Sequence, residues 1–139
     1  MENGQRKSAI KLTSAIRDFK DLQMWKTARE LRKMIFDLTK SFPKEERYIL
    51  FSQMRRAAVS VTANIAEGYG RFSYQESIQF CRQSRASVYE LRDHRTSVLD
   101  AGYSPIEKLK GIDRLAMSEI RLLNGYIRST KNRKEKAES

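Results

Sequence analysis

The sequence predicts an all-α protein, an antiparallel four-helix bundle with up-down-up-down topology. Apolar residues recur at steps of three and four along most of the chain, which is the period of an amphipathic helix. The 139 residues include only two prolines and six glycines, so few positions break a helix. No segment shows the recurrent β-branched alternation that is typical of a strand. The joints between the helical segments are short, and short joints make neighbouring helices antiparallel.

The first predicted helix covers residues 20–40. Its apolar stripe consists of Leu22, Trp25, Ala28, Leu31, Ile35 and Leu38. Pro43 suits the first turn of a second helix over residues 44–67, because its missing N–H costs nothing there. The inward face of this second helix is expected to hold Arg47, Leu50, Met54, Ala57, Ala58, Val61 and Ile65. Gly68 is predicted to stop the helix, because glycine tolerates the left-handed conformation at a helix C-terminus.

A third helix is predicted to begin with the capping box of Ser73 and Glu76 and to end near Asp100. Its inward positions are expected to be Ile78, Cys81, Arg85, Val88, Leu91, Val98 and Leu99. Small residues predict close packing on two sides: Ser77, Ser84, Ala86 and Ser87. A second capping box, Ser104 and Glu107, is predicted to open the fourth helix. The stripe of that helix is Ile106, Leu109, Ile112, Leu115, Ala116, Ile120, Leu123 and Ile127.

These elements predict one bundle domain over residues 19–128. Residues 1–18 have weak periodicity and are expected to form a flexible arm. Residues 129–139 are expected to be a disordered basic tail, because Lys131, Arg133, Lys134 and Lys136 alternate with polar residues and no apolar anchor accompanies them.

The chain is strongly basic, with a formal net charge of +11, and most of the excess falls within residues 19–130. Such an excess creates a positive field that attracts nucleic acid or other polyanions. The alternative interpretation is that the charge only aids solubility. The field therefore favours a nucleic-acid-binding function, with RNA or DNA as the partner, without identifying the ligand.

Single cysteine and histidine residues limit the chemistry of the chain. Cys81 cannot form an intramolecular disulfide and is expected to be a small buried side chain. His94 has no second ligand nearby, so no metal site is expected. The N-terminus does not resemble a signal peptide, and no apolar stretch approaches the roughly 20 residues of a membrane span. We therefore expect a cytoplasmic protein with no membrane contact.

A polar ridge is predicted along the second helix. Its members recur at steps of three or four residues: Gln53, Arg56, Ser60, Asn64 and Glu67. Short side chains in the ridge and an asparagine within a helix indicate a partly buried interface, either between subunits or within the bundle. The alternative is a plain exposed surface. Glu67 is expected to pair with Arg56 or with Arg71.

Basic residues form several candidate nucleic-acid contacts. One group lies on a face of the first helix: Lys26, Arg29 and Lys33. An interrupted ladder lies on the third helix: Arg82, Arg85, Arg92 and Arg95. Arg71 in the preceding joint and the tail residues Lys131, Arg133 and Lys134 complete the set. The planar fork of arginine suits phosphate. The alternative for the ladder is a solvated face paired with acidic neighbours, so the first helix is the better polyanion face.

Aromatic residues flank Arg71 in the joint before the third helix. Tyr69, Phe72 and Tyr74 either stack on bases, as in binders of single-stranded RNA, or pack over the end of the bundle. The sequence contains no glycine-rich phosphate loop, no metal-ligand spacing and no nucleophile–base pair with a third partner. We therefore expect no enzymatic activity and no cofactor.

A longer series of motifs spans residues 19–127. In chain order these are Phe19-Lys20-Asp21-Leu22 with Trp25 and Ala28, Phe42-Pro43-Lys44-Glu45-Glu46, Gln53-x-Arg55-Arg56-Ala57-x-x-Ser60, Asn64-Ile65-Ala66-Glu67-Gly68, Ser87-x-x-Glu90-Leu91 and Gly102-Tyr103. The series resembles the bacterial four-helix-bundle proteins called the 23S rRNA intervening-sequence protein family. Cys81, Ser84 and Ala86 depart from the family pattern, which puts the packing of the third helix in question.

This resemblance implies an antiparallel four-helix bundle that assembles into ring-like homo-oligomers, typically pentamers. Relatives are encoded within insertions in large-subunit rRNA genes. Related bundles act as accessory proteins of diversity-generating retroelements, where they work with a reverse transcriptase and its RNA. We therefore expect a non-enzymatic, ring-forming protein that binds nucleic acid, most of all RNA, through phosphate contacts. The alternative is a protein scaffold for a reverse transcriptase.

Overall fold

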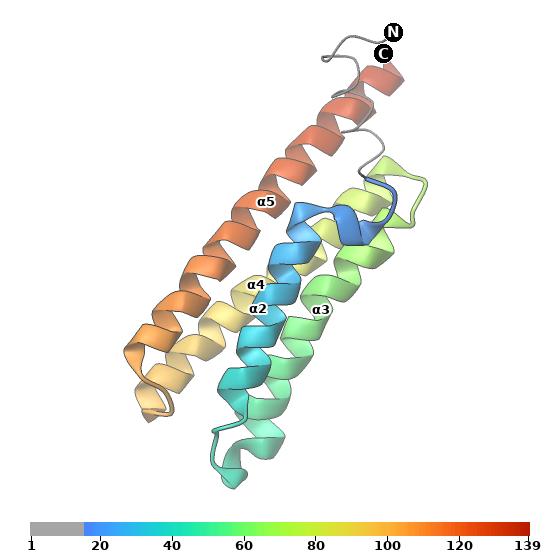
Figure 1. The fold of residues 1–139 in the computed structure, drawn as a ribbon. Helices are drawn as coiled ribbons and strands as arrows, with labels where there is room; N and C mark the ends of the chain where they lie inside the picture. The colour runs from blue at the N-terminus through green and yellow to red at the C-terminus, as the bar shows by residue number, and fades with distance from the viewer. Residues whose placement is uncertain (1–15) are drawn as a thin grey trace, which may run out of the picture.

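The protein is an all-α four-helix bundle, as the sequence predicts (Figure 1). The computed structural model describes residues 16–139, and these contain no β-strand. The helices are α2 (Gln23–Thr39), α3 (Ser52–Tyr69), α4 (Tyr74–Ala101) and α5 (Ile106–Glu138). They run alternately up and down, and short loops join them. Most of the arm expected over residues 1–18 lies outside the described residues.

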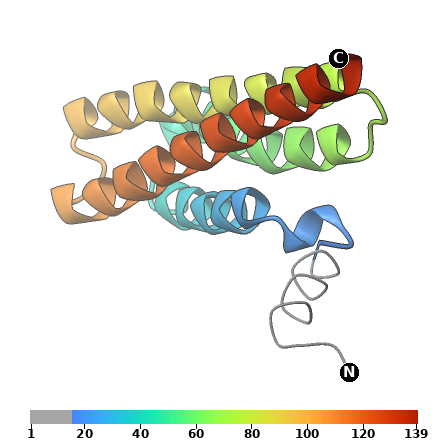
Figure 2. The same cartoon turned by 90° about the horizontal axis from the view of Figure 1, so that it is seen from above.

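The core lies between all four helices. α2 and α4 each pack against both α3 and α5, which closes the bundle (Figure 2). The largest fully buried apolar side chains come from every helix: Leu31, Ile35, Leu38, Met54, Val61, Ile65, Ile78, Val88, Leu91, Leu109 and Leu123. Three residues predicted to face inward are exposed instead, namely Arg47, Leu99 and Ile106. All three lie at or near the ends of elements.

The segment before α3 is not the continuous helix predicted from residue 44. A 3₁₀ turn (Lys44–Glu46) is followed by a π-helical turn (Arg47–Phe51). A π turn inserts residues relative to the α period, so it rotates the following side chains around the axis. The Tyr103 hydroxyl donates to a Glu46 carboxylate oxygen at 2.6 Å, which ties this segment to the loop before α5.

α3 and α4 approach each other closely. Gly68 is buried, and a Cβ atom built on it would lie 2.9 Å from the Cβ of Phe80. The Ser84 hydroxyl donates to the Val61 carbonyl at 2.8 Å, across the same seam. The prediction that Gly68 stops α3 through a left-handed conformation is therefore wrong. The role of Gly68 is to admit α4, and Gly102, with φ of 72°, is the only residue of 16–139 with positive φ.

The two predicted capping boxes have different outcomes. The Ser73 hydroxyl accepts the N–H of Glu76 at 3.3 Å and caps α4. Ser104 does not cap α5: its hydroxyl donates to the Pro105 carbonyl, and Pro105 occupies the N-cap position. The proline ring fixes φ in the range that a following helix requires.

The C-terminal segment is helical, which corrects the expectation of a disordered tail over residues 129–139. α5 continues to Glu138. Thr130 is buried, and the Lys134 ammonium donates to the side-chain oxygen of Gln75 on α4 at 3.2 Å. Lys134 also pairs with Glu138 one turn further along. A hydrogen bond to α4 thus supports a helix that has no apolar anchor in its last two turns.

Glu119 is an acidic residue in the middle of the core. Its side chain is fully buried, and neither carboxyl oxygen has a hydrogen-bond partner among residues 16–139. Burial raises its pKa to about 9, so the carboxyl group is protonated and neutral at pH 7. The same burial raises the pKa of the neighbouring Cys81 thiol to about 11, with a further contribution from Glu119. Cys81 is buried, as the sequence predicts.

Gly68→Ala is expected to destabilise the protein by about 1–3 kcal/mol, because the new methyl group overlaps the Cβ of Phe80 and the helices must separate. Gly125→Ala is the matched control, because a Cβ there meets nothing within 4 Å. That control is expected to stabilise α5 by about 1 kcal/mol. Urea denaturation measures both. Equal effects of the two variants would contradict the close approach at Gly68.

Glu119→Gln is expected to flatten the pH dependence of stability. The carboxyl ionises in the unfolded chain from about pH 4.5 and in the folded protein from about pH 9. Stability is therefore retained at acid pH and falls as the pH rises between these values, by at most about 1.4 kcal/mol per pH unit. The variant lacks this loss and gains stability relative to wild type at pH 8. Denaturation at pH 5 and pH 8 measures the free energy of unfolding of both proteins. If the variant loses as much stability as wild type between these pH values, Glu119 is not the group responsible.

Candidate nucleic-acid interface

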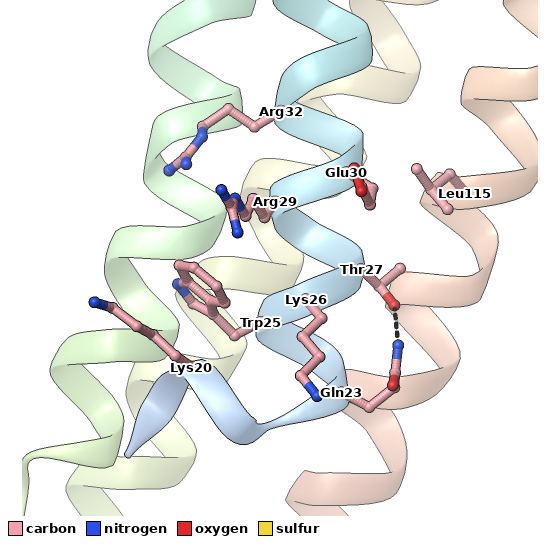
Figure 3. A pocket seen from close by; sticks show the side chains of 9 residues that line it. All are labelled: Lys20, Gln23, Trp25, Lys26, Thr27, Arg29, Glu30, Arg32 and Leu115. Atoms are coloured by element: carbon pink, nitrogen blue, oxygen red, sulfur yellow. Dashed lines mark hydrogen bonds between the residues drawn. The ribbon is translucent and has the colours of Figure 1, made fainter.

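An open groove of about 620 Å³ lies over the outer side of α2 (Figure 3). Four cationic side chains line it: Lys20, Lys26, Arg29 and Arg32. Glu30 is the one acid among the lining residues. Lys20 precedes the helix, in a 3₁₀ turn (Phe19–Asp21), and the other three belong to α2. Steps of three residues from Lys26 to Arg32 bring their side chains to the same side of the helix. The groove is therefore predominantly positive.

Most of this charge is not neutralised by ion pairs within residues 16–139. Lys20, Lys26 and Arg29 form no ion pair with any described residue, whereas Glu30 pairs with Lys33 at 3.7 Å. The pKa of Asp21 is lowered chiefly by the hydrogen bond from the Arg17 N–H and further by the charge of Lys26. Of the three first-helix residues predicted to bind nucleic acid, Lys26 and Arg29 thus form no ion pair within residues 16–139, whereas Lys33 is partly neutralised.

Arg32 and Lys20 are groove residues that the sequence analysis did not single out. Arg32 is half-buried and donates to the Thr62 hydroxyl of α3 at 3.0 Å. The step of three from Lys26 and Arg29 to Arg32 is the signal that could have identified it. Lys20 could not be found this way, because the chain enters α2 through an extended residue, Leu22, which breaks the helical register.

The arginine ladder of α4 faces α5 and is occupied by contacts within the bundle. Arg85 donates to the Asn124 side chain at 2.6 Å, and Arg95 donates to the Leu109 carbonyl at 3.0 Å. Arg92 pairs with Asp113 at 3.6 Å. These three residues join α4 to α5. Their geometry therefore does not favour the prediction that they bind phosphate.

Arg82, Lys131 and Lys134 come together at the end of the bundle where α5 leaves α4. They line an open cleft with Gln75, and two acids, Glu135 and Glu138, line the same cleft. Arg133 turns away, donates to the Thr130 hydroxyl and lies over the Tyr126 ring at 5.8 Å. The acids make this second basic cluster less positive than the groove on α2.

The joint between α3 and α4 presents an exposed aromatic side chain. Phe72 is fully exposed and does not pack over the bundle end, while Tyr69 is half-buried and Tyr74 is partly exposed. Arg71 lies over the Phe80 ring at 4.8 Å and pairs with both Glu67 and Glu76. The expected pair of Glu67 with Arg71 is therefore present, and this candidate phosphate contact is neutralised.

The polar ridge of α3 lies along the seam with α4. At its centre Ser60 and Asn64 are half-buried: the Asn64 amide donates to the Ser60 carbonyl and hydroxyl, and the Ser87 hydroxyl donates to Ser60. At one end Arg56 donates to Gln53 and pairs with Glu90 of α4. The ridge is thus partly an interface within the bundle, and its outer ends, Gln53, Arg56 and Glu67, are exposed.

Arg55 has a structural role that the sequence analysis did not assign. Its guanidinium donates to the Thr39 hydroxyl at 2.8 Å and to the Phe36 carbonyl at 3.1 Å, near the C-terminus of α2. It also lies over the rings of Phe36 and Phe51. A cation at the negative end of a helix dipole is favourable, so Arg55 fastens α2 to α3.

The described part of the chain offers no site for a metal ion. No group of three or more potential ligands occurs among residues 16–139. His94 instead contacts Glu90 at 3.0 Å on its own helix. None of the described helices is long and apolar enough to cross a membrane.

Comparison with known proteins identifies the family. The family model described as "23S rRNA-intervening sequence protein" matches residues 20–125. A crystal structure of a protein from the S23 ribosomal protein family of Bacteroides thetaiotaomicron has the same fold, with a TM-score of 0.70. It is 20% identical, over 76% of this chain and 95% of that one. No curated protein matches. Because the model covers most of the bundle, the chain belongs to the 23S rRNA-intervening sequence protein family.

Proposed function

We propose that this protein is a non-enzymatic nucleic-acid-binding protein, with RNA as its ligand, and that the groove on α2 is its main phosphate-binding surface. The observation that carries the proposal is the set of three cations, Lys20, Lys26 and Arg29, that no acidic residue of 16–139 neutralises by an ion pair. The family name connects relatives with the 23S rRNA gene, which supports an RNA-related role.

The proposal places the contacts on α2 because most other candidate cations have partners of their own, and the cleft of Arg82 and Lys131 also contains Glu135 and Glu138. Arginines on α4 are bound to α5, and Arg71 is paired with two glutamates. A polyanion would have to displace those partners before it could bind there. On α2 it would displace only water and counterions, and release of counterions from the nucleic acid drives such association.

A second part of the proposal is self-association into a ring, with the α3–α4 surface as the contact. Short or apolar side chains are exposed on the outward sides of these two helices: Val59 and Ala63 on α3 and Ala86 on α4. Short side chains allow two helical surfaces to approach closely, and exposed apolar residues that lie together favour a protein partner. A ring would also place several copies of the basic groove on one particle and strengthen the field.

The alternative function is a scaffold for a reverse transcriptase. The fully exposed Phe72 at the α3–α4 loop and the exposed Tyr48 and Ile49 before α3 favour contact with another protein. Pull-down with a reverse transcriptase encoded beside the gene distinguishes the two functions. Capture that persists after nuclease treatment would favour the scaffold, and loss of capture would favour nucleic acid as the direct ligand.

The double variant Lys26→Glu/Arg29→Glu is expected to weaken RNA binding by about tenfold or more at low salt, because two phosphate contacts are lost. The dependence of log K on log salt is expected to fall by about 0.7–0.9 for each contact. Fluorescence anisotropy with a labelled RNA measures both quantities.

The matched control is Lys110→Glu/Arg114→Glu, which reverses two exposed cations on α5 away from the groove. It changes the net charge equally and is expected to have the smaller effect. Equal losses from both double variants would reject the groove as the binding surface, and no binding by wild type at low salt would reject the function.

Asn64→Leu and Arg56→Glu are expected to shift the protein towards monomer with helicity intact, because both residues lie on the proposed contact surface. Light scattering coupled to size exclusion gives the mass, and circular dichroism gives the helicity. Lys110→Glu/Arg114→Glu again serves as the control and is expected to keep the wild-type mass. An unchanged mass in both ridge variants would reject the interface.

A further inference from the structure

Trp25 lies within the basic groove of α2. In Figure 3 its indole lies between the side chains of Lys20 and Arg29, on the flank of the helix that faces α3. The indole packs against the Phe19 ring in a T-shaped contact, with ring centroids 5.5 Å apart and planes at 69°. The guanidinium of Arg29 lies 5.8 Å from the indole centroid. The aromatic ring is thus held in a defined position next to cations.

This arrangement differs from a surface that binds phosphate alone. Phosphate contacts require cations only, whereas an aromatic ring among cations provides a face on which an unpaired base stacks. In a duplex the bases are already stacked on one another, so the ring gains no partner there. In a single strand each base has a free face, and stacking on an aromatic side chain adds to the electrostatic attraction.

Trp25 is half-buried, and the fully exposed Phe72 is another aromatic residue beside a cation, but its surroundings are less suitable. Phe72 is more exposed than Trp25, yet the cation beside it, Arg71, pairs with Glu67 and Glu76. A nucleic-acid backbone near Phe72 would meet these two carboxylates. Lys20 and Arg29 beside Trp25 have no such partners among the described residues.

We propose that the groove on α2 binds a single-stranded segment of nucleic acid, with one base stacked on Trp25 and the adjacent phosphates on Lys20, Lys26 and Arg29. This inference rests on the proposed function and names the class of its ligand. It assigns to Trp25 a contact with the ligand in addition to its packing against the core. Single-stranded RNA is then preferred over duplex RNA of the same length.

The chain contains one tryptophan, so its fluorescence reports on this position alone. An oligouridine of about 12 nucleotides is titrated into the full-length protein at low salt. Stacking of a base on the indole is expected to quench the emission, and added salt is expected to restore it as the strand dissociates. An RNA duplex of equal length, bound through phosphates, is expected to leave the emission nearly unchanged.

Two substitutions separate stacking from electrostatics. Trp25→Leu keeps an apolar residue against the core but removes the aromatic face, and it is expected to weaken oligouridine binding about fivefold to a hundredfold. Trp25→Phe keeps an aromatic face and is expected to recover most of that loss. Both variants are expected to bind the duplex as wild type does. Circular dichroism verifies that each is folded.

The outcomes distinguish this inference from the proposed function. If wild-type protein binds single-stranded and duplex RNA equally, with no quenching, stacking on Trp25 is rejected while phosphate binding stands. Equal weakening of both RNAs by Trp25→Leu also rejects stacking. If neither RNA binds at low salt, the proposed function and this inference fail together.

Discussion

The close packing of α3 on α4 is the constraint on which the other features of this bundle depend. It requires a residue without a side chain at position 68, where α4 presents the Cβ of Phe80. It also requires small hydroxyl residues along the seam, and Ser84 and Ser87 use their hydroxyls to reach Val61 and Ser60 across it. These hydrogen bonds satisfy polar groups that the close approach removes from water. The seam is therefore both tightly packed and polar.

The orientation of α4 follows from this seam and determines where its arginines point. With its small residues against α3, the helix presents Arg85, Arg92 and Arg95 to α5, where they find Asn124, Asp113 and the Leu109 carbonyl. Arginines that fasten two helices are restrained and are not available to a ligand. Among the described residues, the groove on α2 therefore keeps cations that no ion pair neutralises, namely Lys20, Lys26 and Arg29. Packing of one helix pair thus decides which basic surface is open.

The sequence predicted the number and order of the helices because their apolar stripes are long and periodic, as along α2 and α5. Apart from local contacts such as Glu67 with Arg71 and the cap at Ser73, it did not predict which polar residues meet. The spacing of Arg82, Arg85, Arg92 and Arg95 is the same for a solvated face as for a face bound to α5, and their partners lie far away along the chain. Similarly, nothing local marks Gly68 as a contact with Phe80, and glycine near a helix end is more often a stop signal.

The site was predicted only where one helix suffices to define it. Lys26 and Arg29 were identified because they share a face of α2, and Arg32 continues that face. Lys20 and the ring of Trp25 belong to the same groove only because the extended residue Leu22 turns the preceding 3₁₀ segment back along α2. The C-terminal segment was mispredicted for the same reason. Lys134 donates a hydrogen bond to Gln75, which lies far away along the chain, so the composition of the segment alone does not indicate this contact.

Glu119 shows that this bundle accepts a buried polar group when the group can be neutral. An ionised carboxylate without partners would cost several kcal/mol at this position, whereas the protonated form costs much less. Burial therefore raises the pKa of Glu119 to about 9. The core therefore contributes no charge to the field at pH 7, although an acid lies at its centre. Lys26 and Arg29 are exposed, so their removal acts on binding without changing a buried charge.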